Sequence, residues 1–398
     1  MKVLLVHDYA TATGGAEVQL LGWRAELRRR GHDVRLLASV AGRKAGDGQA
    51  EYDCFGTVSS GRTLLQTANV GALRAVERAI AAFEPDVVHV TMFLTQLSPL
   101  ILRALRNTPC IYQVVWHRPM CPLGTKLLPD GSECHDQWGA ACYRNGCLPM
   151  RDWLPLMLQK AMLDQWKPAV DLYVANSQVM KAALIEHGFD PVTVLWNGTP
   201  EVPARRPLEG PPSVAFVGRL VREKGVDVAM RAFARALQAV PGAQFVLVGD
   251  GPERAAIEDL ITTLHLGGHV KMLGHLPRAE AEAAVSPCWV QVAPSRWVEP
   301  FGLVAIEAQM RGTAVVAHAA GGFLETVEDG RTGVLVPNGD EDAWVHALVG
   351  LLSDRERAEA MGHAGRARAI ELFSERAITD QLIEIYHRVI SDAQQAQR

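Results

Sequence analysis

The order in which short apolar runs alternate with amphipathic segments constrains the fold of this chain most. In the first half, aliphatic and β-branched residues gather in runs that are too short for helices, and longer segments with helical periodicity separate them. This alternation is typical of a doubly wound α/β domain built on a parallel sheet. The predicted strands are Lys2–His7, Asp33–Ala38, Asp86–Val90, Cys110–Val115 and Asp171–Ala175, and the predicted helices include Ala16–Arg30 and Thr67–Phe83.

The alternation stops once and then begins again. Between Trp196 and Pro212 the chain is rich in Pro and Gly, which is typical of a linker. A second set of strands follows, and 398 residues are more than one ordinary core requires, so we expect two domains. The second set is predicted at Val214–Val217, Gln244–Val248, His269–Leu273, Trp289–Val292, Ala314–Ala317 and Gly333–Val336.

Composition excludes several classes of protein. No apolar run approaches the roughly 20 residues that span a bilayer, and the first residues read as a buried strand rather than a signal peptide. We therefore expect a cytoplasmic protein. The net charge is −4 and neither half is strongly basic, which argues against nucleic acid as a partner. The slightly positive first half is compatible with lipid headgroups, so peripheral association with the inner membrane face stays open.

Two glutamates separated by seven residues carry the strongest functional signal. Glu299 is followed by Pro-Phe-Gly, and Glu307 follows in a helical pattern that begins near Gly302. A helix that begins there exposes unpaired backbone N–H groups, which attract anions such as phosphate. Glu299 would lie in the preceding loop and Glu307 about two turns inside the helix. Carboxylates beside a phosphate-binding helix end suit a ligand that carries hydroxyls as well as phosphate, such as a nucleotide sugar.

These residues resemble the E-x7-E signature of the retaining glycosyltransferases of family 4. Other blocks of that family follow in order over nearly the whole chain, and the resemblance is weakest between Arg118 and Met150. It implies the GT-B fold, in which two Rossmann-like, doubly wound domains face each other across a cleft. The blocks are Gly14-Gly15-Ala16-Glu17, Phe216-Val-Gly-Arg219-Leu-Val-Arg-Glu-Lys224-Gly-Val-Asp227, Val248-Gly-Asp-Gly-Pro252 and Gly330-Arg-Thr-Gly333.

The resemblance also implies how the domains divide the work. Residues 1–198 would form an acceptor-binding domain with a cysteine-rich insert at 118–150, and residues 199–212 a linker. Residues 213–374 would bind the nucleotide sugar, and the helical segment 375–398 would cross back onto the first domain. The implied activity is retaining transfer of a hexose-type sugar from a nucleoside-diphosphate sugar, with a UDP-sugar favoured over GDP-mannose. The acceptor would be a hydroxyl of a glycan, a lipid-linked molecule or a small molecule. The alternatives are an inactive nucleotide-sugar-binding scaffold and a phosphorylase or epimerase on the same fold.

The donor residues follow from the family motifs. By resemblance, Arg219 and Lys224 contact the diphosphate, Glu299 the hydroxyls of the donor sugar and Glu307 those of the ribose. The structural alternatives are a solvated basic loop for the cations and a helix-surface position for Glu307. Without a metal, the cations and the helix end would stabilise the leaving diphosphate, so we expect no cofactor. The remaining donor residues are the N–H groups of Phe301, Gly302 and Leu303, the base-binding segment Leu273-Gly274-His275, and Gly15 of the glycine pair, which permits close approach of donor phosphate or acceptor.

His117 is the strongest candidate for a catalytic side chain in the first domain. It follows the strand Cys110–Val115 at its carboxyl end, where α/β sheets place ligands. By resemblance it contacts the sugar near the reacting carbon, and the alternative is an ordinary loop histidine. Arg118 stands where the family often has Asp, so another group would have to orient the imidazole. His89 reads as a packed residue at a strand end, whereas His7 fits either interpretation.

The insert at 118–150 concentrates the cysteines. It holds Cys121, Cys134, Cys142 and Cys147, and His135 lies beside the second of them. The spacing lacks the paired C-x2-C of a zinc knuckle, so reduced thiols, a structural metal and disulfides all stay open. Asp340-Glu-Asp342 matches a D-x-D pattern but precedes a helical segment, so Asp340 is interpreted as a helix N-cap rather than a metal ligand.

Overall fold

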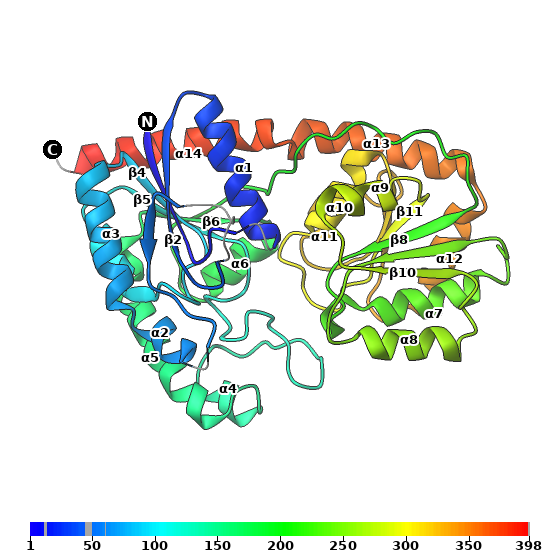
Figure 1. Ribbon diagram of the computed structural model, residues 1–398, viewed down its shortest axis with the longest axis horizontal. Helices are drawn as coiled ribbons and strands as arrows, with labels where there is room; N and C mark the ends of the chain where they lie inside the picture. The colour runs from blue at the N-terminus through cyan, green and yellow to red at the C-terminus, as the bar shows by residue number, and fades with distance from the viewer. Residues whose placement is uncertain (12–13, 44–49, 60, 397–398) are drawn as a thin grey trace. The chain divides into compact units, whose positions relative to one another are not determined.

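The computed structural model describes residues 1–11, 14–43, 50–59 and 61–396, which form two compact units. The first unit is Met1–Gly198 together with Glu375–Arg398, and the second is Thr199–Ser374. Each unit is built on a parallel sheet with helices on both of its faces (Figure 1). The predicted α/β class with two doubly wound domains is confirmed. That the two domains face each other across a cleft stays a prediction.

The first unit contains a seven-stranded sheet among the described residues, with strand order β3-β2-β1-β4-β5-β6-β7. All six neighbouring pairs are parallel. The strands are β1 (Lys2–His7), β2 (Asp33–Ser39), β3 (Tyr52–Cys54), β4 (Val87–Val90), β5 (Cys110–Val114), β6 (Leu172–Ala175) and β7 (Val192–Val194). The helices are α1 (Gly15–Arg29), α2 (Arg62–Thr67), α3 (Val70–Phe83), α4 (Ala140–Arg144), α5 (Met150–Trp166), α6 (Gln178–Glu186) and α14 (Glu375–Ala396), with 3-10 turns η1 (Pro99–Leu105) and η2 (Lys167–Ala169).

Alternation along β1 explains why its sheet is covered on both faces. Leu4 and Val6 belong to one buried cluster and Val3 and Leu5 to another, because successive side chains of a strand point to opposite faces. One cluster lies under α3, η1 and α6, and the other under α1 and α14. A strand buried on both faces must be apolar throughout, which is the pattern that the sequence shows.

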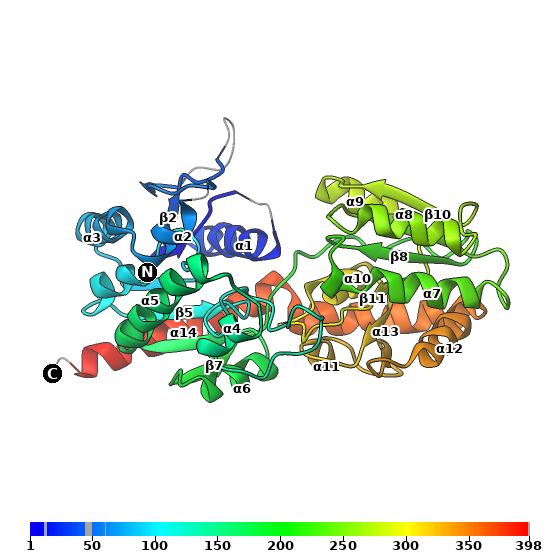
Figure 2. The ribbon, with the colours of Figure 1, turned by 90° about the horizontal axis from the view of Figure 1, so that it is seen from below.

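The last helix, α14, supplies part of the first unit's core. Leu382 and Tyr386 lie four residues apart on one side of α14 and are completely buried. They share a cluster with Trp23 of α1, and both figures draw α1 and α14 in the same part of the molecule (Figures 1 and 2). The Tyr386 hydroxyl bonds Nδ1 of His89 at 2.7 Å, so a buried polar group of α14 is paired with one of β4.

The second unit contains a six-stranded parallel sheet in its described part, with strand order β10-β9-β8-β11-β12-β13. The strands are β8 (Ser213–Val217), β9 (Gln244–Val248), β10 (Val270–Gly274), β11 (Val290–Ala293), β12 (Ala314–His318) and β13 (Gly333–Val336). The helices are α7 (Val226–Ala236), α8 (Arg254–Thr263), α9 (Arg278–Val285), α10 (Leu303–Arg311), α11 (Phe323–Thr326), α12 (Glu341–Leu352) and α13 (Arg355–Phe373), and η3 (Arg222–Lys224) is a 3-10 turn.

The structure differs from the predicted elements at three places. The helix predicted at Thr67–Phe83 begins at Val70, because Asn69 leaves the helical conformation and accepts the N–H of Ala72 as the N-cap of α3, while Thr67 ends the separate helix α2. The short strands β3 and β7 were not predicted, since each has only three residues. Residues 199–212 of the predicted linker are grouped with the second unit, where Arg205 N–H donates to the carbonyl of Arg311 at 2.9 Å.

Candidate active site

The loop between β11 and α10 forms the centre of the candidate site. Gly302 is the N-cap of α10 and has φ 92°, a left-handed conformation that favours glycine. A Cβ at Gly302 would lie 2.6 Å from the ring of Phe323, so the space also requires glycine. The chain therefore turns sharply before Leu303, and the first N–H groups of α10 have no partner within the helix.

Glu299 lies in this loop as predicted and is held by three donors. Its Oε2 accepts hydrogen bonds from Lys224 Nζ at 2.8 Å, Trp297 Nε1 at 2.8 Å and Ser295 Oγ at 3.1 Å. None of these three bonds reaches Oε1, which keeps its capacity to accept. Burial alone would raise the pKa of Glu299, but the Lys224 charge and the three donors lower it below its ordinary value. Glu299 is therefore a buried carboxylate that stays ionised at neutral pH.

The loop that carries Lys224 is locked against the loop that carries Glu299. Gly225 has φ 63°, and a Cβ there would lie 2.1 Å from the carbonyl oxygen of Pro294, so the two backbones touch. Arg296 joins the same two loops, because its N–H donates to the carbonyl of Glu223 at 2.8 Å and its guanidinium pairs with Asp227. Lys224 and Glu299 are thus brought together by the fold.

Arg219 stands apart from this pair. Its side chain is exposed in the turn after β8, and no ion pair links it to another described residue. Gly218 precedes it, and a Cβ at Gly249 would lie 1.8 Å from the Gly218 carbonyl oxygen. The turn is therefore packed closely at its base while the Arg219 guanidinium extends outward.

Glu307 lies nearer to the start of α10 than the sequence predicted. It is the fifth residue of the helix, a little more than one turn from its beginning and not two. Its Oε1 pairs with Arg278 at 3.1 Å. Burial raises the pKa of Glu307, and Arg278 opposes that rise with its charge. Arg278 was not predicted as a site residue, and its only signal in the sequence is its place shortly after the predicted base-binding segment.

The predicted base-binding segment leads directly into the helix that carries Arg278. Leu273 and Gly274 end β10, and His275 follows in the connection to α9. Gly274 has φ 70°, and its carbonyl accepts the N–H of Gly249 at 2.8 Å. Leu273 is 41% exposed and His275 is also exposed, so both side chains are accessible. The ion pair between Arg278 and Glu307 therefore connects this segment's helix to α10.

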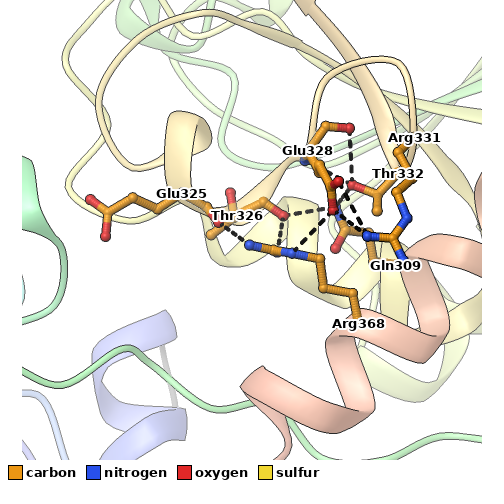
Figure 3. Close-up of polar contacts among 7 residues, drawn as sticks. All are labelled: Gln309, Glu325, Thr326, Glu328, Arg331, Thr332 and Arg368. Atoms are coloured by element: carbon orange, nitrogen blue, oxygen red, sulfur yellow. Dashed lines mark hydrogen bonds and ion pairs between the residues drawn. The ribbon is translucent and has the colours of Figure 1, made fainter.

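Polar contacts behind α10 fix its position in the second unit. Gln309 donates to the carbonyl of Thr326 at 2.9 Å and to Thr332 Oγ1 at 3.3 Å, and Thr332 Oγ1 also accepts the N–H of Glu328 (Figure 3). Arg368 of α13 donates to the same Thr326 carbonyl at 3.0 Å. The family-like block around Thr332 thus supports the helix that carries Glu307.

The first unit contains the remaining predicted residues. Gly15 is the first residue of α1, one residue before the predicted start of that helix. His117 lies in the turn after β5 and is buried, and its carbonyl accepts the N–H groups of Met120 at 2.9 Å and Cys121 at 2.8 Å. Because these bonds use both lone pairs of the carbonyl, this carbonyl is not available to a ligand, and the predicted contact falls to the His117 side chain. That His117 and Glu299 meet at one site stays a prediction.

Arg118 does not take the role that an Asp would have at its position, because its side chain bonds other groups. Its guanidinium donates to Gln66 Oε1 at 3.0 Å and to the carbonyl of Leu94 at 3.4 Å. Burial lowers the pKa of Arg118 to about 10. His89 packs at a strand end as predicted. His7 is also buried, and burial lowers its pKa to about 4.

The cysteines and the D-x-D pattern show no metal-binding arrangement. All seven cysteines are free thiols, and within the described ranges no cluster of three or more His, Cys, Asp or Glu side chains is arranged to hold a metal ion. Asp340 is the N-cap of α12 and accepts the N–H of Ala343 at 2.8 Å, as predicted. Asp342 pairs instead with Arg235 at 2.6 Å.

No helix in the described part of the chain is long and apolar enough to cross a membrane. The residues that sequence reasoning missed are Ser295 and Trp297, both donors to Glu299, and Arg278. Ser295 and Trp297 lie four and two residues before Glu299, so their proximity could have been inferred from the loop itself.

Comparison with known proteins gives one matching family model for each of the two units. The model of the glycosyl transferase 4-like domain matches residues 14–198, and that of glycosyl transferases group 1 matches residues 200–368. Glycogen synthase from Mycobacterium tuberculosis is 32% identical over 203 residues, which are 50% of this chain and 49% of that protein. A GDP-mannose-dependent alpha-(1-6)-phosphatidylinositol monomannoside mannosyltransferase from Mycolicibacterium smegmatis is 36% identical over 180 residues, 44% of this chain and 47% of the relative. The chain thus spans about half the length of the curated relatives that it matches.

The solved structures show the same architecture. HepE from Anabaena, in complex with UDP-glucose, aligns with a TM-score of 0.69 and 22% identity, and the alignment covers 98% of this chain and 100% of that one. At this identity the likeness shows the fold alone. The two family matches together extend over most of the chain, and the chain belongs to the group 1 glycosyltransferases with the GT-B fold.

Proposed function

We propose that this protein is a retaining glycosyltransferase. It would transfer a hexose-type sugar from a nucleoside-diphosphate sugar to a hydroxyl acceptor. The observation that carries this proposal is Glu299, an ionised and buried carboxylate with one oxygen held by three donors and the other left to accept. A UDP-sugar is the favoured donor and GDP-mannose the alternative, since the relatives and structures that match include users or binders of each.

The cations of the second unit fit the negative charge that develops on the leaving diphosphate. Lys224 uses one N–H bond for Glu299, and its ammonium group has two further donors for phosphate oxygens. Arg219 extends from the neighbouring turn, and the first N–H groups of α10 add a fixed partial positive charge. Charge stabilisation of this kind is stronger in the transition state than in the ground state, so it accelerates transfer. We expect no requirement for a divalent cation or other cofactor.

Glu299 and Glu307 would orient the two sugar parts of the donor. Glu299 Oε1 would accept hydroxyls of the transferred sugar, and Glu307, which pairs with Arg278, would accept those of the ribose. The base would lie along Leu273, Gly274 and His275. His117 would contact the sugar near the reacting carbon, with Gly15 permitting close approach of donor phosphate or acceptor. In a same-face reaction the leaving phosphate takes the proton of the acceptor hydroxyl, and the anomeric configuration is retained.

A lipid surface is the proposed location of the acceptor. Helix α5 buries Leu156 and Leu163 on its inner side, yet Met150, Leu154 and Leu158 are 50%, 64% and 55% exposed. These three recur every four residues and therefore form one outward stripe. A helix that is apolar on both sides needs a second apolar neighbour.

Charge favours an anionic membrane as that neighbour. Arg62 of α2, Arg144 of α4 and Arg151 of α5 are exposed, and α2 and α5 lie side by side in both views (Figures 1 and 2). An exposed apolar stripe with exposed arginines on its own helix and on two neighbouring helices suits the interface of a bilayer with anionic headgroups, although Arg151 also pairs with Asp152 at 3.5 Å. We therefore propose peripheral membrane association through the exposed face of α5, which would bring the protein to a lipid-linked acceptor at the inner membrane surface.

The central test replaces Glu299 by Gln. UDP-glucose and GDP-mannose are first screened by thermal shift, since a ligand of the folded state raises the melting temperature. We then expect Glu299→Gln to reduce donor hydrolysis and transfer by about a hundredfold or more, comparable to the loss of one group that stabilises transition-state charge. Affinity for the nucleoside diphosphate should change only a few-fold. Asp342→Asn, an exposed carboxylate of the same unit, is the matched control.

Two outcomes would contradict the proposal. Full turnover by Glu299→Gln would remove this carboxylate from catalysis. Binding of a nucleotide sugar by the wild type with neither hydrolysis nor transfer would indicate the inactive scaffold. Proton NMR of the product's anomeric centre decides between retention and inversion.

A further inference from the structure

A second histidine lies directly behind the Glu299 loop. His318 is the last residue of β12 and is 2% exposed. Its Nδ1 lies 2.8 Å from the carbonyl oxygen of Ser295. A carbonyl oxygen only accepts hydrogen bonds, so Nδ1 carries the proton and donates it to Ser295. Ser295 is also the residue whose hydroxyl donates to Glu299 Oε2.

The other ring nitrogen of His318 is fixed by a tryptophan. Trp344 of α12 is completely buried, and its Nε1–H donates to His318 Nε2 at 2.8 Å. Indole is only a donor, so Nε2 must be the unprotonated nitrogen. The imidazole is therefore neutral, with one tautomer and one orientation fixed by two bonds at opposite sides of the ring. Nothing in the transfer chemistry described above uses this pair.

The segment that begins with His318 holds the Glu299 loop at both of its ends. His318 binds the carbonyl of Ser295 at the start of the loop. The N–H of Gly322 donates to the carbonyl of Glu299 at 2.7 Å, and a Cβ at Gly321 would lie 2.3 Å from the same oxygen. Residues 318–322 thus hold both ends of the loop between Ser295 and Glu299 in place.

We propose that His318 is a positioning residue for Glu299, acting through the Ser295 carbonyl and oriented by Trp344. The inference rests on the proposed function, because it assumes that Glu299 serves the transferred sugar. With the Ser295 carbonyl fixed, the Ser295 hydroxyl and the Trp297 indole both reach Oε2, and these bonds leave Oε1 able to accept from a ligand. Without that bond the loop gains freedom, and a small displacement of a positioning group costs rate far more than affinity.

A pair of amide variants separates the two bonds of the imidazole. The Asn amide can occupy the place of Nδ1 and keep the donor to Ser295, whereas the longer Gln side chain reaches the place of Nε2 and keeps only the acceptor for Trp344. We expect His318→Gln to lower kcat for hydrolysis of UDP-glucose or GDP-mannose, whichever donor binds, by about ten- to a hundredfold, with KM and diphosphate affinity within about threefold. His318→Asn should stay within about threefold of the wild type in kcat.

The melting temperatures and a variant at Trp344 distinguish a loss of positioning from a loss of folding. Equal loss of kcat in the Asn and Gln variants, in step with their melting temperatures, would show that His318 only fills space and would overturn the proposal. Trp344→Phe keeps an aromatic ring at this place, although a smaller one, and removes the donor, so a moderate loss of kcat with unchanged KM is expected from it. Should His318→Gln not fold, Trp344→Phe decides, and wild-type kcat in that variant contradicts the proposal.

Combination with Glu299→Gln separates this inference from the proposed function. If His318 acts through Glu299, adding His318→Gln to Glu299→Gln should cause almost no further loss, because coupled residues are not additive. Unchanged hydrolysis by Glu299→Gln alone would refute the proposed function. Loss of hydrolysis by Glu299→Gln with wild-type kcat in His318→Gln would refute only the role of His318.

Discussion

At the scale of single residues, the two glutamates of the E-x7-E motif have opposite electrostatic environments. Glu299 is surrounded by donors and has a lowered pKa, whereas burial raises the pKa of Glu307 although Arg278 pairs with it. Both have an ordinary value of 4.5. The fold therefore stabilises the charge on one glutamate and destabilises it on the other. A carboxyl group whose charged form is destabilised by the fold is typical of a functional site.

The opposite shifts predict opposite pH dependences of stability. A lowered pKa means that Glu299 stabilises the fold above pH 4.5 and loses this contribution as pH falls through its folded pKa. A raised pKa means that Glu307 contributes most below pH 4.5 and loses that contribution as pH rises through its folded pKa. The melting temperature of the wild type relative to Glu299→Gln should thus increase from pH 4 to pH 7. The melting temperature of the wild type relative to Glu307→Gln should decrease over the same pH range. If both relative melting temperatures changed in the same direction, the assignment would be contradicted.

At the scale of elements, the sequence predicted what periodicity and motifs encode. All described strands with four or more residues were located within about two residues, because most of them are apolar runs buried on both faces, although the edge strand β10 is only partly buried. The start of α3 was predicted three residues too early, since the apolar period continues across Asn69 and only this cap residue marks the beginning of the helix. The motif located Glu299 and Lys224, but their ion pair depends on how two loops approach each other. Spacing along the chain does not contain that information.

The exposed stripe of α5 yields a prediction that belongs to this scale. The wild type should sediment with vesicles of phosphatidylglycerol and phosphatidylcholine, and much less with phosphatidylcholine alone. Leu154→Glu combined with Leu158→Glu should reduce the bound fraction by about tenfold or more, since it removes apolar burial and adds repulsion. Arg151→Glu should weaken binding about fivefold or more, from roughly 1 kcal/mol per basic residue.

The control is another exposed apolar residue of the same unit. Ile185 of α6 is 51% exposed, and Ile185→Glu should leave vesicle binding unchanged. Equal loss in all variants would indicate nonspecific adhesion. Wild-type protein that ignores anionic vesicles, or that forms a dimer through α5, would refute the membrane proposal.

At the scale of the whole molecule, the first unit is assembled from two distant parts of the chain. Helix α14 follows the entire second unit in sequence, yet Ile378, Leu382 and Tyr386 are completely buried in the core of the first. The free energy of unfolding of a domain is only about 5–15 kcal/mol. Loss of several such buried side chains would therefore remove most of the stability of the unit.

Leu382→Ala should therefore destabilise the first unit selectively. The expected cost is about 2–5 kcal/mol, the range for truncation of a buried leucine. Calorimetry with limited proteolysis should show an earlier transition for Met1–Gly198, while Thr199–Ser374 resists as before. Glu384→Ala, at an exposed position of the same helix, is the control and should change little. An equal shift of both units would mean that α14 stabilises the molecule as one cooperative block.

The placement of α14 has a consequence for how the protein is made. A ribosome finishes the strands of the first unit early, but the helix that covers one face of their sheet is translated only after Ser374. At about 5–20 residues per second, the intervening residues 199–374 take roughly ten to thirty-five seconds to synthesise. Through that interval the apolar side chains that α14 will cover face water or a chaperone. The first unit, whose strands are synthesised first, is therefore the last to complete its core.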